Sequence, residues 1–186
     1  SEKFLGKRIG SGEILYNAVN TSIFTPANKS ENKFFTFLIT GNIRKNSNYR
    51  ILSVLYALKE LISENKNKNT QLIIAGLIED INYISLNIKQ LKLEDHIKFF
   101  GEYSQKDAPK IYQKADAYIT MSFQDNCPTA VLEAMASGLP ILYSSSGGIP
   151  ELVGKESGLG IKVKENWEQT IVPHKSAICN GMKEII

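Results

Sequence analysis

Cysteine and long apolar segments are scarce in this sequence, and each shortage excludes a class of protein. The 186 residues include two cysteines, Cys127 and Cys179, which lie far apart and in unlike contexts. They form neither a metal-binding spacing nor a disulfide framework, so we expect a reducing compartment and a cytoplasmic protein. The longest apolar runs have the length of strands, so we expect no transmembrane helix.

Net charge is also low, because 22 Lys and Arg residues stand against 19 Asp and Glu residues, which leaves +3. This is not the concentrated basic surface of a nucleic-acid-binding protein, so we expect no nucleic-acid partner. A weakly basic protein would suit work beside an anionic bilayer, and peripheral contact with the inner face of a membrane stays open. No carboxylate pair has a spacing typical of a metal site, so we expect neither a metal nor a cofactor.

Short apolar runs alternate with helical patterns along the chain, which is typical of a parallel α/β sheet. Strands are expected at 34–40, 71–75, 97–100, 117–121, 141–143 and 159–163. Helices are expected at 49–64, 81–91 and 106–114, from Pro128 onward, and near the C-terminal end. Glycines follow several strand ends, where a ligand can approach the backbone closely. The sequence predicts one Rossmann-like domain with helices on both faces of the sheet and a site at its carboxyl edge.

The most informative segment is SFQDNCPTAVLEAMASGLPILYSSSGGIPELVG, residues 122–154. Its pattern predicts a strand end, an acidic loop, a helix, a strand and a glycine turn, Gly147–Gly148. Asp125 lies in the loop and Glu133 lies eight residues later on the helix. Such a helix start has unpaired N–H groups and a partial positive charge, which suit a phosphate.

The start of this helix has its own sequence signals. Asn126 or Cys127 can cap it, and Pro128 suits the first turn before Thr129, because a missing N–H costs little there. Cys127 has no histidine nearby in the sequence, so we interpret it as a small residue at the cap and not as a catalytic thiol.

Two carboxylates beside an anion-binding helix describe a site for a nucleotide sugar. The D-x7-E step, followed by AMASGLPI and GGIPELV, resembles the donor-site signature of retaining glycosyltransferase family 4, in the GT-B superfold. That family usually has Glu-x7-Glu, so Asp125 is shorter by one methylene. The resemblance implies a retaining, metal-independent hexosyltransferase. In it Glu133 would hold the ribose, Asp125 would orient the transferred sugar, and Gly147 and Gly148 would hold the diphosphate.

Enzymes of this family have two Rossmann-like domains, whereas 186 residues suit one. The resemblance therefore implies the C-terminal, donor-binding half. We expect an inter-domain linker and lead-in strand at 1–32, the nucleotide-sugar-binding domain at 33–172, and the start of a C-terminal helix at 173–186. A glycan or lipid-linked acceptor would be held by the N-terminal domain of the same protein, so this piece alone would be inactive.

The loop after the first expected strand is basic. After Gly41 the chain runs NIRKNSNYR, where the resemblance implies two cations that clamp the donor diphosphate. Asn42 stands at the position of the first cation, and Ser47 stands at that of the second. Either Arg44 or Lys45 takes over the clamp, or the loop is an ordinary solvated one.

Gly101 and Tyr103 follow the third expected strand, where the resemblance implies that the base is seated, largely through backbone groups. Tyr103 could stack on the base or be an ordinary surface residue. The donor would be a UDP- or GDP-sugar. Two alternatives remain open, a catalytically degenerate nucleotide-sugar-binding domain and a GT-B-shaped nucleotide-sugar epimerase.

Overall fold

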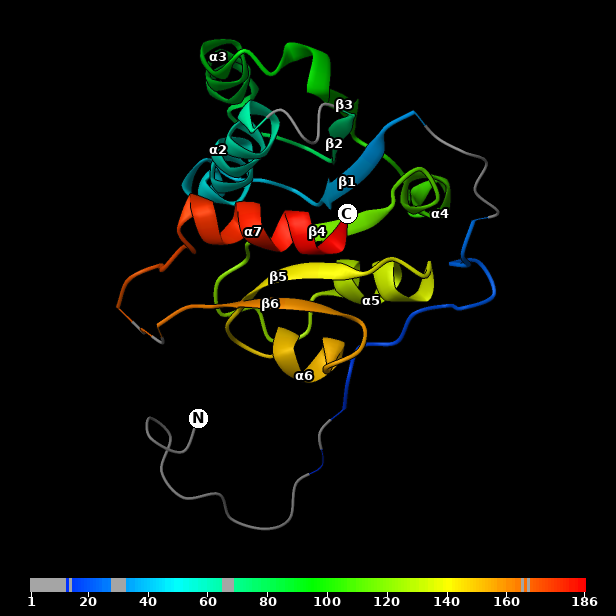
Figure 1. Ribbon diagram of the computed structural model, residues 1–186. Helices are drawn as coiled ribbons and strands as arrows, with labels where there is room; N and C mark the ends of the chain where they lie inside the picture. Colours follow the sequence, from blue (N-terminus) through cyan, green and yellow to red (C-terminus); the bar gives the residue numbers. More distant parts are fainter. Residues whose placement is uncertain (1–12, 14, 28–32, 65–68, 165, 167) are drawn as a thin grey trace.

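A six-stranded sheet, parallel throughout, forms the centre of the protein in a computed structural model that describes residues 13, 15–27, 33–64, 69–164, 166 and 168–186 (Figure 1). The strands are β1 (Phe35–Thr40), β2 (Thr70–Ala75), β3 (Ile97–Gly101), β4 (Ala117–Thr120), β5 (Ile141–Ser145) and β6 (Gly158–Lys162). Their order across the sheet is β3-β2-β1-β4-β5-β6. The Rossmann-like sheet predicted from the sequence is confirmed.

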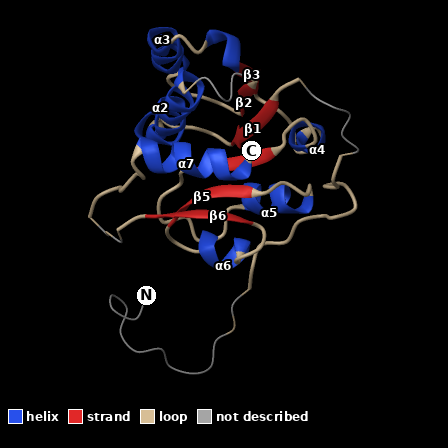
Figure 2. Cartoon of the chain, in the orientation of Figure 1, coloured by secondary structure: helices blue, strands red, loops and turns tan. Residues whose placement is uncertain are grey.

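Helices cover both faces of this sheet (Figure 2). They are α2 (Tyr49–Ser63), α3 (Ile81–Leu91), α4 (Ala108–Tyr112), α5 (Thr129–Ala136), α6 (Ile149–Val153) and α7 (Lys175–Ile185). Short 3-10 helices occupy Lys45–Ser47 and Glu94–His96. One core packs α2, α3 and α7 against the sheet, and the other packs α4, α5 and α6 against its opposite face. Because both faces are covered, β1 and β2 are buried almost throughout.

Helix α2 shows how the sequence pattern produces this packing. Ile51, Leu55 and Leu58 recur at helical spacing, and all three side chains are fully buried. Helix α6 was not predicted, because its five residues directly follow the glycine turn and include Pro150 in the first turn. No helix in the described part of the chain is long and apolar enough to cross a membrane.

The expected lead-in strand is not found in residues 15–27, and most of the rest of the 1–32 segment lies outside the described residues. The segment packs instead on the face of the sheet that α4, α5 and α6 cover. Phe24 is buried and meets the Tyr112 ring edge-on, with 5.7 Å between ring centroids. The Gln113 amide also donates to the Thr25 carbonyl. These contacts hold the segment against α4.

The strand order reverses its direction between β1 and β4. From β1 the chain proceeds outward to β2 and β3, and it then returns to place β4 on the other side of β1. The β1–β4 pairing joins Phe37 with Ala117 and Leu38 with Tyr118. In open parallel sheets the ligand crevice lies outside the carboxyl ends of the strands at such a switch point.

Three hydroxyl groups meet beneath this switch point. Thr40, the last residue of β1, lies 3.1 Å from the Tyr112 hydroxyl and 3.1 Å from the Tyr118 hydroxyl, measured from its Oγ1. Burial raises the pKa of Tyr112 and that of Tyr118 well above the usual value of 10.0. The two phenols therefore remain protonated hydrogen-bonding groups inside the folded protein.

Close backbone packing at the carboxyl edge requires a glycine at position 76. A Cβ added to Gly76 would lie 2.2 Å from the carbonyl oxygen of Gly41, and its φ of +118° is itself unfavourable for other residues. Gly41 has a matching φ of +120°, but a Cβ there would meet nothing within 4 Å. The two positions share a backbone conformation and differ in the space around them.

We therefore expect Gly76→Ala to destabilise the protein more than Gly41→Ala does. Both changes incur the cost of a positive φ, and only the first adds a backbone clash, worth about 1–3 kcal/mol more in free energy of unfolding. Urea denaturation of the two variants and the parent measures the difference. Equal losses would contradict the close approach of the two backbones.

We also expect the free energy of unfolding to fall above about pH 10. Unfolded tyrosines lose their protons there, whereas Tyr112 and Tyr118 keep theirs in the folded state, so the folded state binds more protons. Each pH unit in this window costs about 1.4 kcal/mol per tyrosine. Tyr118→Phe should flatten the decline in urea denaturation, and Tyr83→Phe, at an exposed position on α3, should not. An unchanged slope in Tyr118→Phe would contradict this expectation.

Candidate functional site

Glu133 lies on α5 with its carboxylate almost fully buried beside the switch point, at 6% exposure. The Tyr112 hydroxyl donates to its Oε2 at 2.8 Å, and the Gln105 amide donates to its Oε1 at 2.7 Å. A carboxylate offers about four lone-pair positions, so two such bonds fix its orientation and leave acceptor capacity for a ligand. The arrangement can bind a pair of hydroxyl groups.

Tyr103 completes the surroundings of this carboxylate. Burial raises the pKa of Tyr103, the Thr40 hydroxyl opposes this effect, and the Glu133 carboxylate adds to it. Its hydroxyl therefore lies within electrostatic reach of the acid. Sequence reasoning identified Tyr103 and missed Tyr112, Gln105 and Thr40. No spacing in the sequence indicates their contacts, because the three come from α4, the loop after β3 and the end of β1.

Asp125 lies in a loop that packs tightly on the glycine turn. The N–H of Gly148 donates to the Asp125 carbonyl at 2.9 Å, and a Cβ at Gly148 would lie 1.9 Å from the Asn126 carbonyl oxygen. A Cβ at Gly147 would lie 2.5 Å from the Asp125 carbonyl oxygen. The two glycines are therefore required for loop packing. Within the described part of the chain, no hydrogen bond or ion pair occupies the Asp125 carboxylate.

The start of α5 differs from the prediction. Pro128 is the N-cap and no side chain caps the helix, so the expected cap by Asn126 or Cys127 is wrong. The helix begins one residue later than expected, because Pro128 is extended (φ −68°, ψ 117°) and takes the cap position. Cys127 instead contacts Asn17, which donates its side-chain amide to the Cys127 carbonyl at 2.7 Å and its backbone N–H to the sulfur at 3.3 Å. The first N–H groups of α5, from Thr129 onward, are left available for an anion.

The segment before β1 thus runs alongside the site, as its blue ribbon shows (Figure 1). Besides the Asn17 contacts, the Tyr16 hydroxyl donates to the Glu151 carboxylate on α6. The sequence analysis interpreted this segment only as part of an inter-domain linker and lead-in strand, so these contacts were not predicted.

Backbone contacts attach the basic loop after β1 to the loop that follows β2. Ile43 forms a parallel bridge with Ile78, and the Lys45 N–H donates to the Glu79 carboxylate at 3.0 Å. The side chains of Arg44 and Lys45 are exposed, and neither forms an ion pair with a residue that the structure describes. They remain candidates for contact with phosphate. Asn42 instead accepts a hydrogen bond from the backbone N–H of Leu77 at 3.4 Å.

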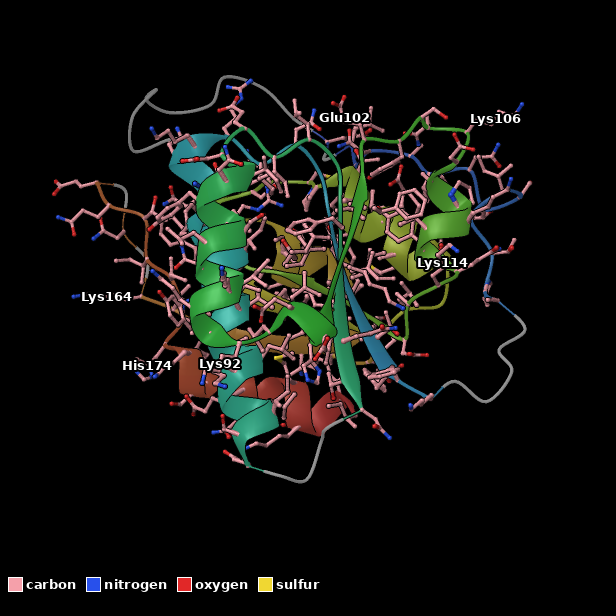
Figure 3. The ribbon with its side chains drawn as sticks, turned by 90° about the horizontal axis from the view of Figure 1, so that it is seen from above. Lys92, Glu102, Lys106, Lys114, Lys164 and His174 are labelled. Carbon is pink, nitrogen blue, oxygen red and sulfur yellow. The ribbon has the colours of Figure 1, made fainter. Side chains whose placement is uncertain are left out.

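Gly101 and Tyr103 line different hollows at the end of β3. Gly101 lies in an apolar groove of about 340 Å³, together with Gly76, Leu77, Ile81, Phe99 and two further residues, Ile78 and Glu102. Tyr103 lines a hollow of about 670 Å³ beside α4, on the side of the sheet where Figure 3 labels Lys106 and Lys114. The groove is wide and apolar enough for an aromatic base.

One group of possible metal ligands occurs among the described residues, and it lies away from this site. Ligand atoms of Glu60, Glu64 and Cys179 lie within 4.8 Å of one another, at the far end of α2 and on α7. The Lys183 ammonium lies 2.6 Å from the Glu64 carboxylate, so a cationic side chain already occupies this group.

Comparisons with known proteins agree with this geometry. The family model "Glycosyl transferases group 1" matches residues 21–172. Spore coat protein SA of Bacillus subtilis is 31% identical over 122 residues, which cover 62% of this chain and 32% of that protein. An Escherichia coli protein named UDP-Gal:alpha-D-GlcNAc-diphosphoundecaprenol alpha-1,3-galactosyltransferase is 27% identical over 154 residues, covering 77% of this chain and 39% of that protein.

Solved structures share the fold. The Anabaena protein HepE, crystallised with UDP and glucose, superimposes with a TM-score of 0.72 at 17% identity, covering 92% of this chain and 46% of that one. The C-terminal domain of a glycosyl transferase group 1 protein from Francisella tularensis gives 0.69 at 18% identity, covering 90% and 87%. This chain thus spans less than half of the relatives above and nearly all of an isolated C-terminal domain. From the family match over most of its length, the chain belongs to the glycosyl transferases group 1 family.

Proposed function

We propose that the chain is the donor-binding domain of a retaining, family 4 glycosyltransferase that transfers a hexose from a UDP- or GDP-sugar. The observation that carries the proposal is the buried Glu133 carboxylate, which Tyr112 and Gln105 orient at the switch point of the sheet. A carboxylate held in this way binds the paired hydroxyls of a ribose. HepE, which has the same fold, was crystallised with UDP-glucose, and this supports a nucleotide sugar as the ligand.

The neighbouring groups fit the remaining parts of a nucleotide sugar. The open N–H groups at the start of α5, the Gly147–Gly148 turn, and the exposed Arg44 and Lys45 would contact the diphosphate. The groove beside Gly101 would seat the base. Asp125, whose carboxylate has no partner in the described part of the chain, would orient the transferred sugar.

Such a site would act on the leaving group. When the anomeric bond breaks, negative charge develops on the β-phosphate, so N–H groups and cations fixed beside it stabilise the transition state more than the ground state. The acceptor, a glycan or a lipid-linked sugar, would enter from an N-terminal domain of the same protein, in the cytoplasm and close to the inner face of a membrane. The donor-binding domain alone would bind and not transfer.

A second function, binding without turnover, is favoured by one observation. Asn42 carries no charge where the family has a cation, and its side chain is engaged by the backbone of the neighbouring loop. A domain without the full clamp could retain donor binding and lose catalysis. Transfer activity in the full-length protein separates the two functions.

A panel of nucleotide sugars titrated against the protein by ligand-observed NMR tests the proposal. We expect a UDP- or GDP-sugar to bind, and we expect Glu133→Gln to weaken that binding by about ten- to hundredfold, because a charged acceptor of buried hydroxyls is worth about 1.5–3 kcal/mol. Glu94→Gln, at an exposed acid before β3 on the opposite edge of the sheet, is the matched control and should bind as the parent does. Equal affinity in Glu133→Gln and Glu94→Gln would reject the assignment of Glu133.

Metal independence gives a separate expectation. Because the proposed diphosphate contacts are N–H groups and cationic side chains, sugar transfer by the full-length protein should persist in excess EDTA. The measurement is product formation with and without the chelator. Activity that disappears in EDTA and returns with Mn²⁺ would mean that a metal ion handles the diphosphate.

A further inference from the structure

Gln124, directly before Asp125, has a backbone conformation that residues with a side chain rarely adopt. Its φ is +55°, and among the described residues only Lys92 shares a positive φ without being a glycine. In this left-handed region Cβ lies too close to the following carbonyl oxygen, so such a residue persists only where the surrounding structure enforces it. Lys92 is the C-cap of α3, where this conformation is common. Gln124 lies in a loop beside the proposed donor site, so its conformation has another cause.

Two hydrogen bonds hold Gln124 in this conformation. Its backbone N–H donates to the Oγ of Ser146 at 3.0 Å, and its side-chain amide donates to the carbonyl of Asn166 at 2.7 Å. Ser146 is buried in the loop after β5. Asn166 belongs to the segment after β6, and its own side-chain Oδ1 accepts from the N–H groups of Glu168 and Gln169. Both anchors therefore belong to other segments that are themselves held in place.

The peptide unit that joins Gln124 to Asp125 is confined by the glycine turn. A Cβ at Gly147 would lie 2.8 Å from the Asp125 nitrogen and 2.9 Å from the Gln124 carbonyl carbon. On the other side of Asp125, its carbonyl accepts from the N–H of Gly148 at 2.9 Å. The backbone of Asp125 thus has little room to rotate. Its side chain leaves the loop in a fixed direction, and its carboxylate has no partner in the described part of the chain.

We propose that Gln124 positions the Asp125 carboxylate for the hydroxyl groups of the transferred sugar. Its left-handed conformation, which Ser146 and Asn166 fix, sets the direction in which the Asp125 side chain leaves the loop. This inference rests on the function proposed above, in which Asp125 orients that sugar. Asp125 is shorter by one methylene than the glutamate of the Glu-x7-Glu pattern. It has one rotatable bond fewer, so the direction of its carboxylate follows the backbone more closely.

The test is a double-mutant cycle between Gln124→Gly and Asp125→Ala. Glycine adopts a positive φ without steric cost, so Gln124→Gly remains folded while it removes the side-chain bond to Asn166 and frees the loop. The ligands are UDP or GDP, and the UDP- or GDP-hexose that binds best in the nucleotide-sugar panel. Ligand-observed NMR measures both affinities, and their ratio reports what the hexose contributes. We expect Gln124→Gly to lower this ratio about tenfold, to bind UDP or GDP as the parent does, and to cause no further loss in the Asp125→Ala background.

Lys92→Gly is the matched control, because it makes the same kind of replacement at the same φ of +55°. Figure 3 labels Lys92 at the end of α3 and Glu102 after β3, at opposite edges of the sheet, so the control lies away from the site. Lys92→Gly should bind both ligands as the parent does. Thermal unfolding verifies that each variant is folded. Gln124→Met, which keeps the side-chain length and removes the amide donor, replaces Gln124→Gly if the latter fails to fold.

The possible outcomes separate this inference from the proposed function. If Gln124→Gly binds the nucleotide hexose as tightly as the parent does, the Gln124 assignment fails and the proposed function stands. Equal losses for the nucleotide and its hexose conjugate would mean that Gln124 only shapes the loop. A loss that persists in the Asp125→Ala background would mean that Gln124 does not act through Asp125, and either result overturns the inference. If the parent binds no nucleotide, the proposed function fails and the Gln124 assignment fails with it.

Discussion

The site depends on one directional chain of hydrogen bonds. The Tyr112 hydroxyl has a single proton and donates it to Glu133, so the bond between Thr40 and Tyr112 must have Thr40 as its donor. Thr40 then accepts from Tyr118. Each donor in this chain polarises the next, and the chain ends on the carboxylate. Because its members come from β1, β4, α4 and α5, the orientation of one acid is determined by the packing of both halves of the sheet.

This interdependence explains which features the sequence could predict. Buried parallel strands appear as short apolar runs, so β2, expected at 71–75, is found at Thr70–Ala75. Helix α4, expected at 106–114, is shorter, since Asp107 is its N-cap and Gln113 its C-cap. Helix α6 carries too few residues to produce a helical period. Local patterns thus predicted the strands and the longer helices in their order along the chain, and the tertiary contacts decided where they end.

The site shows the same division. Asp125, Glu133 and the glycine turn could be identified because they lie in one continuous segment with recognisable spacing. The partners of Glu133 could not, because Tyr112 and Gln105 precede it by 21 and 28 positions on other elements. The helix cap was predicted wrongly because the helix begins after Pro128. The contact of Asn17 with Cys127 could not be predicted either, because Asn17 is far away in the sequence.

The reversal of strand order has a kinetic consequence. Strands β1, β2 and β3 are sequential neighbours, as are β4, β5 and β6, so each half can form from pairings close in the sequence. The two halves meet at β1 and β4, where the register runs through two residue pairs, compared with six between β1 and β2. This short seam closes the longest loop in the sheet, so its formation carries the largest entropic cost. A ligand bound across the carboxyl ends of β1 and β4 would contact both halves of the sheet. Its binding free energy would therefore stabilise the pairing of the two halves.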